Sequence, residues 1–107
     1  MALNTIEFNC KSADPVETID KQVHFGVVGS SDLEVMMIPA QLGNEVRVKI
    51  VTPVRGFDDL WRRVLEAFVD YSKLGNVSVE INDNNATPAV VSLRLRQALA
   101  EATAAEA

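Results

Sequence analysis

Two adjacent serines stand at a turn between two apolar stretches of the chain. The turn reads Gly-Ser-Ser-Asp over residues 29–32, and a second apolar run from Leu33 to Ile38 follows at once. This pattern predicts a β-hairpin whose tip exposes the hydroxyls of Ser30 and Ser31. A hydroxyl without a base is a poor nucleophile, but another enzyme can activate it and use it as an acceptor. Gly29 favours such access because it has no side chain.

The other residues that could do chemistry have no partner at a suitable spacing. Cys10 and His24 are the single cysteine and the single histidine, and neither falls in a zinc or nucleophile motif. Asp32 and Glu34 lie two residues apart, so on an extended strand they should point the same way. An acid pair is one interpretation, and a solvated strand edge is the simpler one. We therefore expect no catalytic residue and no metal site.

Alternation of apolar and polar residues predicts the strands that must carry this turn. It covers residues 5–9, both hairpin arms (residues 23–27 and 33–38), residues 45–50 and residues 77–82. The polar segment 11–21 is expected to form a loop. Pro39 should end the second arm, because proline cannot donate to a sheet ladder. A polar, solvent-exposed face and an apolar, buried face are typical of an antiparallel sheet that is covered on one side.

A first helix is predicted from Asp58 to Ser72, where apolar residues recur at the spacing of one helix face. That stripe consists of Phe57, Leu60, Trp61, Val64, Leu65 and Phe68. Asp58 and Asp59 suit its first turn because negative charge there complements the helix dipole. The helix should cover the apolar face of the sheet.

A second helix is predicted to begin at Thr87–Pro88, a capping residue followed by proline at the first helical position. Its buried face should carry Val91, Leu95, Ala98 and Ala102. The alternative is a strand over residues 90–95, because apolar residues also alternate there. The explicit cap and the strong helix formers that follow favour the helix.

The element order predicts an α+β fold, a two-layer arrangement of a mainly antiparallel β-sheet with two helices packed on one face. The 107 residues suffice for one core, so residues 1–107 are expected to form a single domain. The net charge of −5 argues against binding nucleic acid. No apolar run is long enough to span a membrane. With no visible secretory leader and one cysteine, a cytoplasmic protein is expected.

Three stretches resemble the acyl carrier protein (delta subunit) family of malonate decarboxylase. GVVGSSDLEV, from Gly26, is similar to the family's modification loop G-V-V-G-S-G-D-L/M-E-V, with Ser31 at a family glycine. INDNNATPAVV, from Ile81, and LRL at residues 93–95 resemble H-D-F-G-A-T-P-G-V-V-R-L-R-L, with Asn84–Asn85 replacing Phe-Gly. IVTPVRG at residues 50–56 resembles V-V-T-S-V-N-G, and Trp61 falls at a helical tryptophan of the family.

This resemblance implies a carrier subunit without catalytic activity of its own. In the family, the loop serine carries a phosphoribosyl-dephospho-coenzyme A arm through a phosphodiester, and that serine falls on Ser30. The arm's thiol holds acetyl and malonyl groups as thioesters. Its implied partners are the acyl transferase and decarboxylase subunits of malonate decarboxylase and the prosthetic-group transferase. A tethered thioester reaches each partner at a high effective concentration.

Three other functions remain open from the sequence. A citrate-lyase-type acyl carrier subunit uses a related prosthetic group. A small, unmodified protein-interaction domain would use the hairpin as a docking edge. A hydrolase using Ser30 has little support, since no base is visible. A mass added to the purified protein would separate a carrier from an interaction domain.

Overall fold

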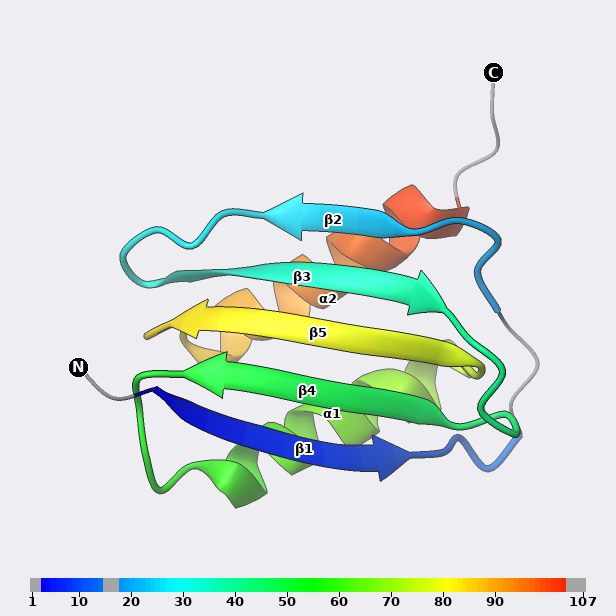
Figure 1. Ribbon diagram of the computed structural model, residues 1–107, viewed down its shortest axis with the longest axis horizontal. Helices are drawn as coiled ribbons and strands as arrows, with labels where there is room; N and C mark the ends of the chain where they lie inside the picture. The colour runs from blue at the N-terminus through cyan, green and yellow to red at the C-terminus, as the bar shows by residue number, and fades with distance from the viewer. Residues whose placement is uncertain (1–2, 15–17, 104–107) are drawn as a thin grey trace.

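The computed structural model describes residues 3–14 and 18–103, which form one five-stranded sheet and two helices (Figure 1). In chain order these are β1 (Asn4–Cys10), β2 (Val23–Gly26), β3 (Asp32–Pro39), β4 (Val46–Thr52), α1 (Asp58–Ser72), β5 (Val77–Asn84) and α2 (Pro88–Thr103). The sheet order is β1-β4-β5-β3-β2, and only the β4–β5 pair is parallel. The predicted α+β class and the predicted element order are confirmed.

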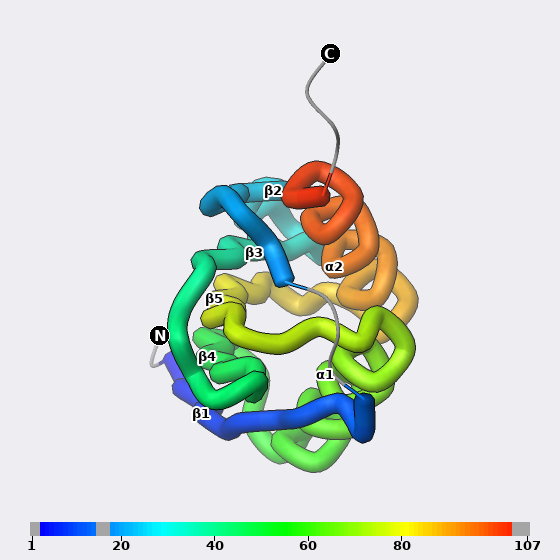
Figure 2. Tube along the Cα trace, turned by 90° about the vertical axis from the view of Figure 1, so that its right-hand side faces the viewer, coloured from blue at the N-terminus to red at the C-terminus, as the bar shows by residue number. Residues whose placement is uncertain are grey.

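Both helices lie on the same face of the sheet and make a second layer (Figure 2). The core between the layers is built from alternate strand residues, and Val46, Val48 and Ile50 of β4 are fully buried in it. The residues between them, Arg47 and Lys49, are exposed on the outer face, as the alternation predicts. Neither described helix is long and apolar enough to span a bilayer.

α1 has the predicted bounds, but its buried face is shifted toward its C-terminal half. Trp61, Leu65, Phe68 and Val69 are buried, at the spacing of one helix face. Phe57 and Leu60 are instead 50% and 39% exposed, so the predicted stripe was wrong at its first two positions. The physical reason is that both line an open cavity at the start of the helix rather than the packed core.

α2 begins at the predicted cap. The hydroxyl of Thr87 accepts a hydrogen bond from the backbone N–H of Val90 at 3.3 Å, and Pro88 is the first helical residue. The four residues predicted for its core face are the four that are buried, namely Val91, Leu95, Ala98 and Ala102. The helix is confirmed, and the alternative strand over residues 90–95 is wrong because the cap and proline direct the chain into a helix.

The β2–β3 hairpin is confirmed, with pairing from Val23–Met37 to Gly26–Glu34. Its first arm is shorter than the apolar pattern suggests. Gly26 has φ +89°, and a Cβ at this position would overlap the backbone oxygen of Leu33. The chain leaves the sheet ladder at this glycine. Val27, predicted as a strand residue, and Val28 are therefore exposed loop residues, which corrects the sequence prediction.

Gly26→Ala is expected to lower the free energy of unfolding by about 2–4 kcal/mol. A left-handed backbone costs a non-glycine residue about 1–2 kcal/mol, and the overlap with Leu33 adds about as much again. Gly43→Ala is the matched control, because Gly43 has φ +62° but a Cβ added there would meet no atom within 4 Å. Urea unfolding should show a smaller loss there. Equal losses in both variants would contradict the role of the Leu33 contact.

Candidate functional site

The hairpin loop, which we define as residues 27–31, lies at one end of the sheet, between β2 and β3 (Figure 1). β4 and β5 end at this side of the sheet, and both helices begin there. Ser30 and Ser31 are both exposed in this loop. The sequence prediction that the serines stand at an accessible hairpin tip is consistent with this placement.

A backbone hydrogen bond closes the loop into a turn around the two serines. The N–H of Asp32 donates to the carbonyl of Gly29 at 3.1 Å, which makes Ser30 and Ser31 the two central residues. Ser31 has φ +61°, a conformation that favours glycine or asparagine. The glycine that the resembling family has at this position would therefore fit the same backbone, and Ser31 keeps the turn despite its side chain.

Asp32 anchors the base of the loop to α2 through Arg94. The guanidinium donates twice, from Nε to Oδ1 at 3.0 Å and from Nη2 to Oδ2 at 2.8 Å. The backbone N–H of Leu33 donates to Oδ1 at 2.7 Å. The hydrogen bonds from Arg94 and then from Leu33 hold the pKa of Asp32 below its usual value, so the carboxylate is charged at neutral pH.

Arg94 lies beside both arms of the hairpin. It forms the ion pair with Asp32 of β3, and its Cδ would lie 3.5 Å from a Cβ built on Gly26 at the end of β2. Its Nη1 donates to Oε1 of Gln97 at 2.8 Å, which holds the guanidinium on α2. The sequence analysis did not single out this residue. The pair is 62 residues apart, and the only sequence signal was the motif resemblance around residues 93–95.

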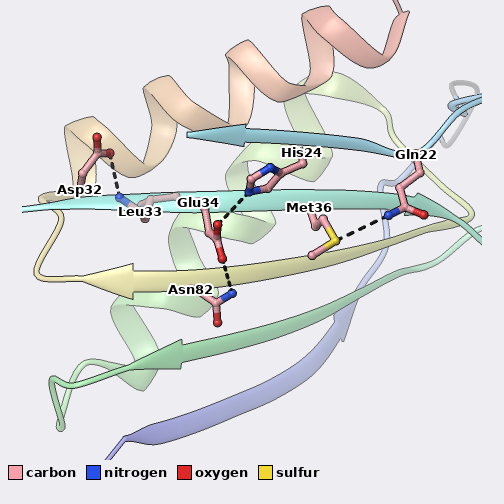
Figure 3. A network of polar contacts seen from close by, with 7 residues as sticks. All are labelled: Gln22, His24, Asp32, Leu33, Glu34, Met36 and Asn82. Atoms are coloured by element: carbon pink, nitrogen blue, oxygen red, sulfur yellow. Dashed lines mark hydrogen bonds and ion pairs between the residues drawn. The ribbon is translucent and has the colours of Figure 1, made fainter. Parts of the chain in front are cut away.

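Asp32 and Glu34 do not form the acid pair that their spacing allowed. Glu34 lies on the outer face of the sheet, where its Oε2 is 2.8 Å from Nε2 of His24 and its Oε1 accepts from Nδ2 of Asn82 at 2.7 Å (Figure 3). The bond from His24, and then that from Asn82, lowers the pKa of Glu34. Asp32 turns to α2 instead. The two carboxylates thus have separate structural partners.

The remaining candidate nucleophile is buried. Cys10 lies in the core, where burial, followed by the charge of Glu66, raises the pKa of its thiol to about 11. A protonated, buried thiol is unreactive at neutral pH. Among residues 3–14 and 18–103, no three His, Cys, Asp or Glu side chains gather as a metal site would require. The described site therefore offers an accessible hydroxyl on a braced turn.

The turn between β5 and α2 packs beside the hairpin loop. Asn84 pairs with Asp32 across the sheet. Buried Asp83 accepts hydrogen bonds from the Thr52 hydroxyl at 2.8 Å and from the backbone N–H of Ala86 at 2.9 Å. Asn85 has φ +64°, where the resembling family has glycine, so this departure also keeps a left-handed backbone. The turn between β5 and α2 is thus held in place beside the base of the hairpin loop.

Acid should release the loop from α2. The folded-state pKa of Asp32 is depressed, so the ion pair stabilises the fold fully above the unfolded pKa, about 4, and its contribution is lost as the pH falls further through the folded pKa. We expect the backbone amide signals of residues 29–32 to shift together below about pH 4. Arg94→Gln should raise the midpoint of that shift toward the ordinary aspartate value. An unchanged midpoint would contradict the assigned pairing.

Comparison with known proteins points to one family. Residues 20–102 match the family model described as the malonate decarboxylase delta subunit. A malonate decarboxylase acyl carrier protein from Malonomonas rubra is 52% identical over 104 residues, which cover 97% of this chain and 93% of that protein. One from Burkholderia cepacia is 46% identical over 99 residues, covering 92% and 90% of the two chains.

A solved structure is also similar over nearly the whole chain. It is a chain in the crystal structure of a Pseudomonas malonate decarboxylase hetero-tetramer in complex with malonate. The TM-score is 0.73 at 32% sequence identity, and the match covers 94% of this chain and 98% of that chain. The sequence similarity and the shape similarity therefore extend over the same elements that hold the hairpin loop.

Proposed function

Because this chain belongs to the family of malonate decarboxylase acyl carrier proteins, we propose that it carries acyl groups on a phosphoribosyl-dephospho-coenzyme A arm attached to Ser30. The observation that carries this proposal is the braced turn that presents the Ser30 hydroxyl to solvent. When bound, the arm supplies a thiol that holds an acyl group as a thioester. Catalysis of acyl transfer and decarboxylation belongs to partner subunits.

The residues around Ser30 fit a covalently attached group. In the described part of the chain, the loop is held by the backbone of Gly29 and the side chain of Asp32, and no hydrogen bond uses the Ser30 hydroxyl. Ser30 is exposed, and a Cβ at the neighbouring Gly29 would meet only a methyl group of Val27, at 3.9 Å, so the space beside Ser30 on that side is also open. A transferase can therefore reach the hydroxyl without first breaking a structural contact.

The end of the fold around the hairpin loop also suits contact with partner subunits. Of the large apolar side chains exposed in residues 3–14 and 18–103, all but Tyr71 lie at this end, namely Leu3, Val27, Val28, Phe57, Leu60 and Leu93. Exposed apolar residues gathered at one end of the fold favour contact with other proteins there. We propose that the acyl transferase and decarboxylase subunits and the prosthetic-group transferase bind here. Each of them must reach the group attached to Ser30.

Residues 1–107 would then act as one cytoplasmic carrier domain. Family membership sets aside the citrate-lyase-type alternative, and the engaged states of His24 and Glu34 give no support to a hydrolase. An unmodified interaction domain is the remaining rival. It would use the same exposed end for docking, but it would carry no added mass.

Peptide mass spectrometry of the protein purified from its own source tests the proposal. We expect the mass of the arm on the peptide that contains the hairpin loop, with the fragment series placing it on Ser30. Ser31→Ala is the matched control and should still gain this mass. Attachment to Ser31 would overturn the site assignment. No added mass on protein isolated from an active malonate decarboxylase complex would favour the interaction domain.

A further inference from the structure

A cavity of about 270 Å³ opens at the same end of the fold as the hairpin loop. Its walls come from the start of α1, the start of α2 and the turn between β5 and α2. Phe57 lines it from just before α1, Leu60 and Trp61 line it from α1, and Val91 lines it from α2. The volume approaches the lower end of the range of about 300–1,000 Å³ that is usual for small-molecule sites. It also exceeds the roughly 150 Å³ apolar cavity that accepts benzene in an engineered protein.

The lining is apolar except for Asp83 and Asn85, and no described residue that lines the cavity is a lysine or an arginine. A diphosphate or a carboxylate would find no positive partner there. Burying an unpaired carboxylate is costly, and the acidic side chain of Asp83 in the wall adds like-charge repulsion. An uncharged chain with apolar and amide groups fits this chemistry, because the two polar residues offer hydrogen-bonding groups to it.

Ser30 lies within reach of the cavity. Asp32 pairs with Asn84, and the next residue, Asn85, lines the cavity. The path from Ser30 to Asn85 consists of three steps along the chain of about 3.8 Å each and one step of about 5.5 Å between paired strands. The Cα atoms of Ser30 and Asn85 are therefore at most about 17 Å apart. An arm that contains a nucleotide diphosphate followed by a pantetheine chain is longer than this. Its far end can therefore enter the cavity while its near end stays on Ser30.

Resting on the proposed function, we infer that this cavity is a resting site for the acetylated pantetheine end of the arm on Ser30. The acetyl thioester and the pantetheine amides are uncharged, so they can leave water for the apolar walls. A malonyl group carries a carboxylate that the cavity does not match. The same cavity therefore retains the acetyl form and leaves the malonyl form in solvent, accessible to a partner subunit.

The position of Trp61 makes the inference directly measurable. Trp61 is the only tryptophan of the chain, and its side chain lines the cavity. The protein is loaded with the arm, acylated with ¹³C-labelled acetyl or malonyl, and studied by NMR. We expect contacts from the acetyl methyl group to the Trp61 ring, with a shift of the indole N–H signal relative to unmodified protein. The malonyl methylene group should show no such contacts, and the indole signal should stay at its unmodified position.

Two variants and one free ligand complete the test. Ala86→Leu fills the cavity and should abolish the contacts while mass spectrometry still finds the arm. Ala100→Leu makes the same change at an exposed residue of α2 outside the lining, and it should keep them. Free S-acetylpantetheine, added at millimolar concentration to unmodified protein, should shift the same indole signal. If no arm is found on Ser30, the proposed function fails, and this free ligand alone decides the cavity inference.

The inference is overturned if the acetyl arm leaves Trp61 unchanged, or if acetyl and malonyl arms shift it equally. It is also overturned if the indole signal shifts when partner subunits are added and does so equally in the arm-loaded protein and in the unmodified protein. In that case the cavity is a docking site for a partner's side chain.

Discussion

Ser30→Ala is expected to abolish attachment of the arm and to leave the reconstituted malonate decarboxylase complex unable to decarboxylate malonate. The fold should be unaffected, because Ser30 is exposed and the described hydrogen bonds of the loop do not use its hydroxyl. Surface changes of this kind alter the free energy of unfolding by no more than about 0.5 kcal/mol. Mass spectrometry after incubation with the transferase, carbon dioxide release and urea unfolding measure the three effects.

Ser31→Gly is the informative control for this variant. It removes the neighbouring hydroxyl and gives φ +61° to a residue that adopts it readily. We expect normal attachment to Ser30, and a free energy of unfolding that is unchanged or raised by up to about 1 kcal/mol. Malonate turnover by a complex that contains unmodified Ser30→Ala protein would refute the carrier role. Loss of folding would mean that the hydroxyl supports the turn.

The regular elements could be predicted because their signals are local. The bounds of α1 follow from residues three and four apart, and the start of α2 follows from one cap and one proline at Thr87–Pro88. The end of β2 could not be predicted in this way. Val27 continues the apolar alternation, but Gly26 turns the chain out of the sheet because of the Leu33 backbone opposite it. That neighbour is fixed by the hairpin register, which the alternation does not specify.

The same distinction between local signals and long-range contacts applies to the site. The turn pattern located two serines, and only the family resemblance distinguished Ser30 from Ser31. The brace between Asp32 and Arg94 depends on how α2 crosses the sheet, and no spacing within either segment encodes that crossing. For the same reason the sequence does not distinguish the partners of Asp32 from those of Glu34. Their partners, Arg94 for one and His24 for the other, come from different layers and strands.

Positive φ angles at residues other than glycine explain two of the departures from the family motif. Ser31 and Asn85 both take the left-handed conformation where the resembling motif has glycine. Asparagine tolerates this conformation better than most residues, whereas serine has no such advantage. The backbone of the site is thus retained through different side chains. A motif comparison alone registers such positions as mismatches.

Trp61→Ala is expected to lower the free energy of unfolding by about 3 kcal/mol, the lower end of the range of about 3–5 kcal/mol for buried aromatic residues. Trp61 is 7% exposed and belongs to the buried face of α1. One side of its ring borders the cavity rather than packed atoms, so it has fewer contacts to lose than a fully enclosed tryptophan. Urea unfolding followed by far-ultraviolet circular dichroism measures the loss without relying on tryptophan fluorescence.

Leu60→Ala separates packing against the sheet from simple loss of apolar surface on α1. Leu60 is the preceding residue of the same helix and lines the same cavity, but it is 39% exposed. Alanine is also the stronger helix former, so the helix itself does not suffer. We expect a loss of about 1 kcal/mol or less, as is usual for partly exposed positions. Similar losses in both variants would contradict the observed buried face of α1, because they would mean that Leu60 packs as tightly as its buried neighbour Trp61.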